Sequence, residues 1–555
     1  MDAMHVLSAA EMQACDRATT ERFGIASIDL MRTAAKAVAA FAQMQFPRAR
    51  RVIVLCGRGN NGGDGMMTAR LLSAAGLEVT TLLLGAPEGF GADAVTAWGE
   101  LLASAAPGTV HVIESAAELA GHNEALNADL VIDAVVGTGF KPPLKGLAKS
   151  ALEWIKTSRA SFLSIDLPSG WAADSTNSAG TGPVFPSDAV ITFTAPKPAH
   201  VFAQLTRRWD QPVVVASIGS PQAAIVSTKR LEWTGSAMQL ARTPRAAAAN
   251  KGNFGHVLVV GGSVGRSGAP SMTSLAALRS GAGLVTAAVP AAVLAQVSAV
   301  APELMTHPLP ARDSGGISDK SLTPSALAAL LERKTVLAIG PGLGQAAETV
   351  KFVTGLLAAT KIPAVIDADA LNILAAKPVL LAKLAKGRTV VLTPHPGEMA
   401  RLAGITITEV QSNRLEVART FAQRFGVTLV LKGARTLISH PDGHIAVNTT
   451  GNPGMAKGGS GDSLTGVVAG FLAQYADDGA RAVEAAVYLH GLAADLAVKQ
   501  GDEHTLLATD SLQQFFRAFR FDSRGDNGYV WLQGLPAGSM PVVCPNEAGS
   551  REVPN

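Results

Sequence analysis

Short apolar runs that each end in a loop rich in glycine, proline or aspartate recur along the chain. In the first half these runs are RVIVLCG, LEVTTLLLG, ADLVIDAVVGTG, ASFLSIDLPSG and DAVITFTAP. Continuous apolar runs of this length are typical of strands buried on both faces of a parallel sheet. Intervening segments such as MMTARLLSAAG have helical spacing of their apolar positions and end at a glycine. The pattern predicts an α/β fold with helices on both faces of a parallel sheet.

The alternation restarts after a less regular stretch near residues 227–249. Strands are predicted at HVLVVGGS, TVLAIGPGLG, PAVIDADALN, TVVLTPHPGE and TLVLKG, and two apolar helices follow. We expect the boundary near Pro221 to Leu231, and therefore two α/β domains, residues 1–225, with a Rossmann-like arrangement, and residues 226–515, each a three-layer sandwich.

Both ends of the chain depart from this alternation. A helical stretch from Glu11 to about Phe46 is expected before the first strand. Periodic features fade late in the chain, so residues 516–555 are predicted to form an irregular, loosely docked tail.

Composition and charge narrow the class of protein. The 555 residues are 48% hydrophobic and 16% charged, which is typical of globular domains with large cores. With 47 basic and 44 acidic residues the net charge is +3, too balanced to indicate a nucleic-acid binder. Cys15, Cys56 and Cys544 lack metal-ligand spacing and are expected to be free thiols. Without a signal peptide or an apolar run of about 20 residues, a cytoplasmic protein with no membrane partner is expected.

A first candidate site follows the strand RVIVLC. Gly57 to Gly62 read GRGNNG, which matches the GxGxxG spacing of dinucleotide-binding turns. The next strand, however, lacks a terminal acid to hold a ribose, and Asp64 would repel a pyrophosphate. These departures disfavour an ordinary NAD-dependent dehydrogenase.

Acidic and hydroxyl side chains end two further strands of the first half. Asp133 and Asp166 each follow an apolar run, and Ser169 lies in the loop after Asp166. Asn61, Asp133 and Ser169 offer hard oxygen ligands for a monovalent cation. The alternative is that these residues are only helix caps and turn formers.

The motifs NNGGDG, DAVVGTG and DLPSG resemble, in order and spacing, the YjeF N-terminal family of NAD(P)H-hydrate epimerases, over roughly Leu7 to Gly219. The resemblance implies potassium ligands at Asn61, Asp133 and Ser169, and an acid/base role for Asp166. It implies substrate contacts at Asn60, Asn61, Gly62, Gly63, Asp64, Gly137, Thr138, Gly139, Phe140, Lys141, Pro142, Pro143 and Asp166.

A second candidate site precedes the apolar helix SLTGVVAGFLAQ. Gly458 to Asp462 read GGSGD, a run of small residues whose backbone N–H groups can converge on an anion at a helix N-terminus. No GKS or GKT follows, so this is not a Walker A loop. Asp462 is a candidate general base for a substrate hydroxyl, the alternative being a helix cap on a glycine-rich turn.

GNPGMAKGGSGD resembles the ribokinase-like superfamily, and TPHPGE with LKGARTL indicates its NAD(P)H-hydrate dehydratase family, over roughly His256 to Asp510. The resemblance implies a substrate site at Ala269, Gly344, His395 and Asp462. It implies nucleotide contacts at Lys432, Gly433, Ala434, Arg435, Thr436 and Gly461. The co-substrate is expected to be ADP, with ATP as the alternative, together with Mg²⁺. Asp367 and Asp369 either help to place the magnesium nucleotide or are structural acids.

Together the resemblances imply repair of the R and S hydrates of NADH and NADPH. The first domain would interconvert the epimers. The second would dehydrate the S form and release AMP and phosphate. Two alternatives remain: a ribokinase-like small-molecule kinase with a regulatory first domain, or a first domain that is a non-catalytic binding module. The expected partners are the two hydrates and ADP, and a homo-oligomer is expected.

Overall fold

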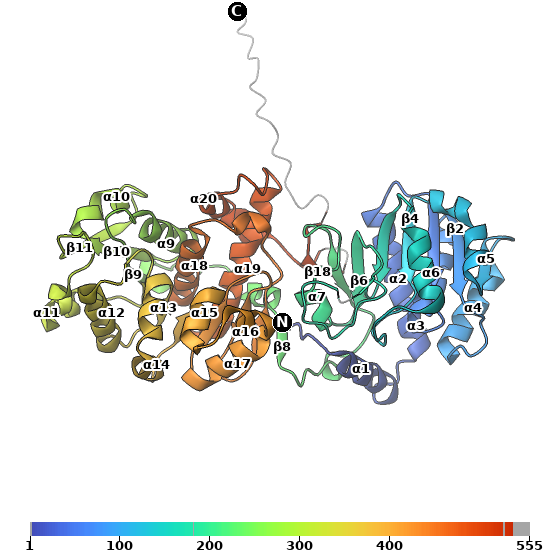
Figure 1. Ribbon diagram of the computed structural model, residues 1–555, viewed down its shortest axis with the longest axis horizontal. Helices are drawn as coiled ribbons and strands as arrows, with labels where there is room; N and C mark the ends of the chain where they lie inside the picture. The colour runs from blue at the N-terminus through green and yellow to red at the C-terminus, as the bar shows by residue number, and fades with distance from the viewer. Residues whose placement is uncertain (1–2, 181, 526–527, 537–555) are drawn as a thin grey trace, which may run out of the picture.

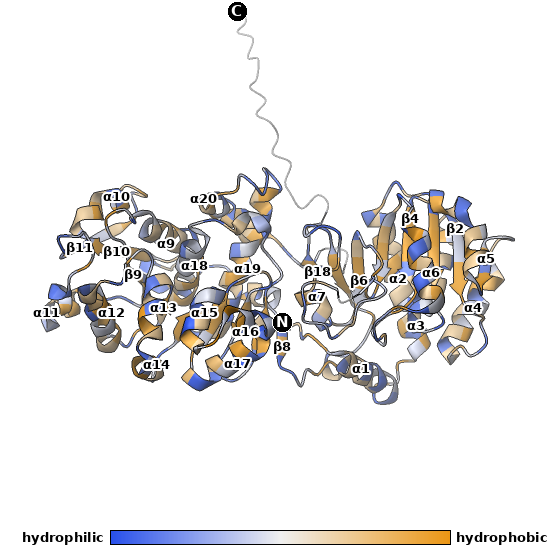
Figure 2. Ribbon diagram, in the orientation of Figure 1, coloured by the Kyte–Doolittle hydropathy of each residue, from blue (hydrophilic) through white to orange (hydrophobic). Residues whose placement is uncertain are grey.

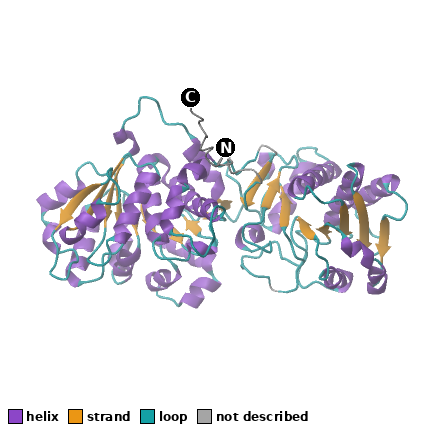
Figure 3. Ribbon diagram, turned by 90° about the horizontal axis from the view of Figure 1, so that it is seen from above, coloured by secondary structure: helices purple, strands orange, loops and turns teal. Residues whose placement is uncertain are grey.

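The computed structural model describes residues 3–536 except residues 181 and 526–527. Two twisted β-sheets follow one another along the long axis of the molecule, and helices cover both faces of each (Figures 1 and 3). The predicted α/β class with two three-layer units is confirmed. In Figure 2 the strands of both sheets are mainly hydrophobic, as expected for strands buried on two faces.

The first sheet has the order β18-β7-β6-β5-β4-β1-β2-β3, and all its pairs are parallel except β18 with β7. Its strands are β1 Arg51–Cys56, β2 Glu78–Leu84, β3 Val110–Ile113, β4 Leu130–Ala134, β5 Ser161–Ile165, β6 Ala189–Phe193, β7 Val213–Ala216 and β18 Tyr529–Gln533. Its helices are α1 Ala9–Glu21, α2 Ser27–Gln45, α3 Asn60–Ala74, α4 Ala92–Ser104, α5 Ala116–Gly121, α6 Gly146–Ile155 and α7 Pro198–Phe202. The predicted helical stretch before β1 is therefore two helices, with a turn at Gly24 (φ 72°) between them.

The second sheet has the order β11-β10-β9-β12-β13-β14-β15-β16-β17-β8. Its strands are β8 Leu231–Trp233, β9 His256–Val260, β10 Leu284–Pro290, β11 Met305–Leu309, β12 Val336–Ile339, β13 Ala364–Ile366, β14 Val390–Leu392, β15 Thr428–Leu431, β16 Leu437–Ser439 and β17 Ile445–Val447. Its helices are α8 Gln239–Arg242, α9 Gly268–Arg279, α10 Leu294–Ser298, α11 Pro324–Leu331, α12 Ala347–Ala359, α13 Ala368–Ala375, α14 Pro378–Leu384, α15 Pro396–Ala403, α16 Ile407–Ser412, α17 Arg414–Phe425, α18 Ser460–Gln474, α19 Gly479–Val498, α20 Ala508–Gln513 and α21 Phe515–Arg520.

Both sheets contain the same reversal of strand order near their centre. The chain runs outward through β1, β2 and β3, then returns to β4 on the other side of β1. The second sheet repeats this arrangement with β9, β10, β11 and β12. The reversal leaves a crevice at the carboxyl ends of the central strands, which is where open α/β sheets bind ligands.

The glycines of NNGGDG allow α3 to pack directly on the sheet. A Cβ on Gly62 would overlap the carbonyl oxygen of Gly57, and a Cβ on Gly65 would lie 2.5 Å from Cβ of Ala134. Close helix–strand approach therefore requires glycine at both positions. The segment Asn60 to Asp64, expected as a loop, instead forms the first turns of α3.

The predicted irregular tail is wrong for its first part. Residues 515–520 form α21, and β18 adds antiparallel to β7 at the edge of the first sheet. The chain thus returns from the second sheet to the first (Figure 1). Trp531 is 2% exposed and Tyr529 donates to the carbonyl of Ala37, so tertiary packing orders a strand too short for periodicity to reveal. The rest of the predicted tail from residue 537, with Cys544, lies outside the described residues.

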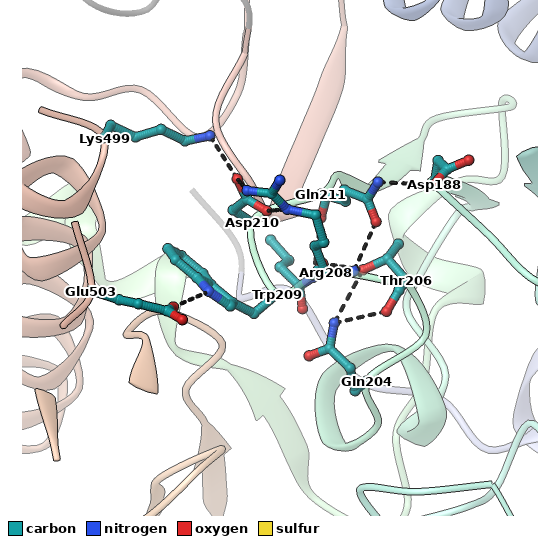
Figure 4. Close-up of polar contacts among 10 residues, drawn as sticks. Asp188, Gln204, Thr206, Arg208, Trp209, Asp210, Gln211, Lys499 and Glu503 are labelled. Atoms are coloured by element: carbon teal, nitrogen blue, oxygen red, sulfur yellow. Dashed lines mark hydrogen bonds and ion pairs between the residues drawn. The ribbon is translucent and has the colours of Figure 1, made fainter. Parts of the chain in front are cut away.

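Segments of the first half contact the second sheet and its helices at two places. The N-terminal segment pairs with β8, since the N–H of Val6 donates to the carbonyl of Leu231 at 2.9 Å. Residues 204–211, shown in Figure 4, approach the end of α19, where Trp209 donates to Glu503 at 2.9 Å. Lys499 bonds Asp210 at 3.1 Å in the same view. The junction is therefore built by packed elements from both halves.

Within the described residues no helix is long and apolar enough to cross a membrane. Cys15 and Cys56 are buried free thiols.

Candidate active sites

The first candidate site is a cavity of about 590 Å³ at the crevice of the first sheet. Its lining includes Asn61 from the start of α3, Thr138 from the loop after β4, and Asp166 directly after β5. It also includes Asp16 from α1 and Lys197 from the loop before α7. Five segments that are distant in sequence therefore converge on one polar cavity.

Asp166 is the most highly coordinated side chain of this cavity. Its Oδ2 accepts from the N–H of Thr138 at 2.8 Å and from the hydroxyl at 2.5 Å. Its Oδ1 accepts from Nζ of Lys197 and from Thr192, both at 2.9 Å. The backbone has φ 66°, a left-handed conformation that aspartate tolerates better than most residues. Both carboxylate oxygens are therefore fixed by donors.

These donors hold Asp166 in its charged form. Burial alone would raise the pKa of Asp166, but Lys197, His200 and Thr138 together hold it well below the usual range. Lys197 is 2% exposed and forms a buried ion pair with Asp166. A carboxylate with so low a pKa is a poor proton carrier, so the predicted acid/base role of Asp166 is disfavoured.

Two other carboxylates of the cavity, Asp64 and Asp16, have pKa values that are raised instead of lowered. Burial raises the pKa of Asp64 well above its usual value, and the negative charges of Asp166 and Asp16 raise it further. Burial also raises the pKa of Asp16, with Asp166 adding to the shift and Lys197 opposing it. These groups can therefore carry a proton beside a fixed negative charge.

Of the three residues expected to bind a cation, Asn61 lines the cavity, whereas Asp133 and Ser169 are hydrogen-bonded to each other behind it. Asp133 is fully buried and accepts from the Ser169 hydroxyl at 2.6 Å and from its N–H at 2.7 Å. Burial raises the pKa of Asp133 to about 6. Both amide atoms of Asn61 are buried and have no hydrogen-bond partner among the described residues. Because an unpaired buried amide is costly, an additional ligand at Asn61 fits this arrangement.

Not every expected substrate residue lines the cavity. The residues that do are Asn60, Asn61, Asp64, Gly137, Thr138, Gly139, Phe140 and Asp166. Gly62 and Gly63 pack toward Gly57 and Met31, so they support the helix instead of lining the cavity. Lys141, Pro142 and Pro143 also lie outside the lining.

Sequence reasoning missed Lys197, Asp16 and His200. Nε2 of His200 lies 2.6 Å from the carbonyl oxygen of Asp166, and burial with the charge of Lys197 lowers the pKa of His200 to about 4. The one signal was a lysine and a histidine in TAPKPAH, directly after a predicted strand.

The second candidate site lies at the carboxyl ends of β13, β14 and β15. Asp367, His395 and Lys432 follow these strands, and Asp462 enters in the first turn of α18. Nζ of Lys432 is 2.9 Å from Oδ1 of Asp367, and the Thr465 hydroxyl donates to Oδ2 at 2.8 Å. The N-terminus of α18 therefore lies beside an ion pair between a partly buried lysine and a buried aspartate.

Asp462 has the electrostatic properties expected of a general base. Burial and the negative charge of Asp367 raise the pKa of Asp462 to about 6, although Lys432 opposes the shift. Its backbone is held by Thr273 of α9, whose hydroxyl donates to the Asp462 carbonyl at 3.0 Å. A carboxylate with a pKa near neutrality accepts a proton more readily than an ordinary aspartate.

The residues expected to contact the nucleotide lie in two different places: Lys432 and Gly461 are at the start of α18, and the Arg435 side chain is at the junction between the sheets. Nζ of Lys432 would lie 3.3 Å from a Cβ on Gly461, so this ammonium is beside the helix terminus, where an anionic phosphate would bind. The side chain of Arg435 instead points into the junction between the sheets. It donates to the carbonyls of Thr449 and Ala203, each at 3.0 Å, and to Gln533. A nucleotide contact by the Arg435 side chain is therefore disfavoured, because these acceptors already hold it.

The remaining residues expected to contact substrate lie near the carboxyl ends of the same strands of the second sheet. His395 caps α15 through Nδ1, which accepts from Gly397 at 3.0 Å, and its side chain is about half exposed. Asp369 accepts from the N–H of Gly344 at 2.8 Å. Asp367 and Asp369 are thus both engaged within the protein, which supports their structural role more than direct coordination of magnesium. Ala269 lies in the first turn of α9, close to the Gly342 turn.

Two protein-family models match this chain, one in each half. A family described as YjeF-related protein N-terminus matches residues 27–199, and one described as NAD(P)H-hydrate dehydratase matches residues 257–515. Among solved structures, an ADP/ATP-dependent NAD(P)H-hydrate dehydratase from Bacillus subtilis, co-crystallized with ATP/Mg²⁺, is 34% identical. It covers 51% of this chain and 96% of its own, with a TM-score of 0.43.

Relatives match along nearly the whole chain. A bifunctional NAD(P)H-hydrate repair enzyme from Moorella thermoacetica is 42% identical over 92% of this chain and 95% of its own. Enzymes of the same name from Coxiella burnetii and Escherichia coli are 36% and 34% identical. They cover 88% and 89% of this chain, and 94% and 90% of their own. The chain therefore belongs to the family of bifunctional NAD(P)H-hydrate repair enzymes.

Proposed function

We propose that residues 1–225 epimerise the hydrates of NADH and NADPH at the Asp166 cavity, and that residues 226–515 dehydrate the S hydrate at Asp462. The observation that carries the assignment is the placement of the two carboxylates: Asp166 is fixed by Lys197 and Thr138 in the wall of a polar cavity, and Asp462 lies in the first turn of α18 beside the Lys432–Asp367 pair. In this assignment β18 is a C-terminal addition to the epimerase sheet.

In the epimerase site Asp166 acts as a fixed negative charge. Loss of the hydroxyl from the hydrated ring carbon leaves a cation, which a carboxylate locked by Lys197 and Thr138 stabilises. Asp64 has a raised pKa and donates the proton with which the hydroxyl leaves as water. Return of water to the other face gives the second epimer and restores the proton to Asp64.

Potassium fits the Asn61, Asp133 and Ser169 group. The orphaned Asn61 amide and the buried Asp133 carboxylate are oxygen donors of the kind that hard cations prefer. When bound, the cation supplies a fixed positive charge that anchors an anionic or hydroxylated substrate. These three residues orient the start of α3 and the two strand-end loops around the cavity.

In the dehydratase site Asp462 removes the proton from the hydroxyl of the hydrate. The oxygen attacks the terminal phosphoryl group of ADP, with ATP as the alternative, and AMP leaves. Lys432 and the N-terminus of α18 stabilise the charge on the transferred group. The phosphate then departs from the ring with loss of a ring proton, which regenerates NAD(P)H. Mg²⁺ enters with the nucleotide.

One assay tests both proposals. Purified protein receives a mixture of both NADH hydrate epimers, and the absorbance of reduced nicotinamide is followed with Mg²⁺ and either ADP or ATP. Full recovery is expected with nucleotide. Asp462→Asn should abolish recovery, whereas Asp166→Asn should leave rapid recovery of only the S fraction. A stable phosphorylated product without NADH would instead support the kinase alternative.

A further inference from the structure

A cluster of histidines and glutamates lies at the β16–β17 hairpin, separate from the residues assigned to either reaction. His440 directly follows β16 and His444 directly precedes β17. Glu484 reaches the hairpin from the second turn of α19. One nitrogen or oxygen atom of each of these three side chains lies within 4.8 Å of the others.

We propose that His440, His444 and Glu484 form a binding site for a late first-row divalent cation such as Zn²⁺. Imidazole and carboxylate are the ligand types that zinc sites combine. Nε2 of His440 is 3.0 Å from Oε1 of Glu484, and Nδ1 of His444 is 3.8 Å from the same oxygen. The donor atoms of the three side chains are therefore close enough together to bind one metal ion.

The second nitrogen of each histidine faces a partner that would orient the ring. Nδ1 of His440 lies 3.4 Å from the hydroxyl of Thr428. Nε2 of His444 lies 3.4 Å from Oε2 of Glu232 of β8, although it makes no hydrogen bond among the described residues. Metal-bound histidines almost always use their other nitrogen in this way. The rings are stacked, with centroids 5.3 Å apart and planes inclined by 15°.

The two oxygens of Glu484 have different surroundings. Glu484 is 1% exposed, and its Oε2 has no hydrogen-bond partner among the described residues, although Nη1 of Arg481 lies 3.6 Å away. Oε1 lies within hydrogen-bond distance of Nε2 of His440, at 3.0 Å. A bound metal ion would replace this hydrogen bond, and Oε2 would keep Arg481 as its neighbour.

Both imidazoles must be neutral to bind a metal ion, so zinc affinity should weaken as the pH falls. The site joins the hairpin to α19, and the other end of β16 adjoins the predicted nucleotide loop. The metal would thus stabilise the strand that follows this loop.

The experiment uses the full chain after treatment with a chelator. Zn²⁺ alone is titrated by calorimetry, and retained zinc is counted by mass spectrometry after desalting. One equivalent per wild-type chain and a rise in Tm of a few degrees are expected. Zinc X-ray absorption should show two imidazole nitrogens and a carboxylate oxygen at about 2.0–2.2 Å.

His444→Asn is the decisive variant because it changes the hairpin turn and neither proposed active site. It should lose the zinc equivalent and the Tm rise, while NADH recovery in the assay above shows that the chain is folded. His111→Asn is the matched control, since His111 also contacts a second histidine, His122, with ring centroids 4.3 Å apart, at the edge of the first sheet. Failure of wild type to retain zinc, or equal zinc in His444→Asn, would overturn the proposal without affecting the proposed reactions.

Discussion

Asp166 and Asp462 lie at the carboxyl-end edges of two similarly ordered sheets, but their surroundings differ. Asp166 accepts from three side chains and one backbone N–H, and its pKa is held well below normal. Asp462 lies near the carboxylate of Asp367, and its pKa rises to about 6. The contrast teaches that fold position locates a functional carboxylate, whereas its neighbours decide whether it acts as a charge or as a base.

The largest effect is expected from Asp462→Asn. Loss of the general base should slow dehydration by about 10²–10⁴-fold, because proton removal from the hydroxyl loses its acceptor. The rate of epimerisation should be unchanged when it is measured by chromatographic separation of the two hydrates. Equal loss of both activities would contradict the assignment of one reaction to each half.

Asp166→Asn should slow epimerisation in the first half nearly as much as Asp462→Asn slows dehydration. It should also lower the free energy of unfolding. Removing one partner of a buried ion pair leaves Lys197 uncompensated and costs about 3–5 kcal/mol of unfolding free energy. Chemical denaturation measures this loss. The double variant Asp166→Asn/Lys197→Met should regain stability without regaining epimerisation. Recovery of epimerisation in the double variant would show that the fixed charge is dispensable.

The pH profile of dehydration tests the role of Asp462 as a base. Since the carboxylate must be ionised, the rate should fall as the pH drops through about 6. The charge of Asp367 raises this pKa, so Asp367→Asn should move the acidic limb to lower pH. Lys432→Met should move it to higher pH, because the lysine lowers the pKa. A limb that stays in place in both variants would exclude Asp462 as the titrating group.

Arg435→Met tests whether the two halves depend on one another. Its guanidinium joins the predicted nucleotide loop to Ala203 and Gln533, so its loss should leave buried acceptors unpaired and cost about 1–3 kcal/mol. Calorimetry should resolve a wider separation between the unfolding transitions of the halves. Arg208→Met is the control, because its ion pair with Asp210 is 72% exposed on the arginine side and contributes little. Equal effects of both variants would contradict an organising role for Arg435.

The smallest effect is expected at the N-terminal attachment. Burial opposes ionisation of Glu11, but hydrogen bonds from Thr228 and Ser8 lower its pKa from 4.5 to about 2. The contribution of Glu11 to the free energy of unfolding is therefore present above pH 4.5 and lost as the pH falls through about 2. Glu11→Gln should cost less than about 1 kcal/mol near neutral pH because solvent screens this contact. The difference from wild type should shrink progressively on acidification; a constant difference would contradict the linkage.

The order of motifs and apolar runs was enough to predict two α/β sheets with parallel central strands and to select Asp166 and Asp462 as candidates. It did not reveal the antiparallel strands β16, β17 and β18 near the sheet edges. Local patterns carry this information because buried strands and glycine-rich helix starts constrain residue types directly. The same patterns failed for Asn60 to Asp64, since a helix rich in glycine resembles a loop. They also failed for β18, whose burial depends on β7, more than 300 residues earlier in the chain.

By itself, the sequence thus determined the fold class, the family and the strand ends that carry the chemistry. Tertiary structure decided that Lys197 pairs with Asp166 and keeps it ionised, that Asp367 raises the pKa of Asp462, and that Arg435 joins the two sheets. These outcomes depend on which side chains meet across long sequence separations, and on how burial strengthens their charges. Neither quantity is encoded in local periodicity, so the electrostatic roles became evident only in the folded chain.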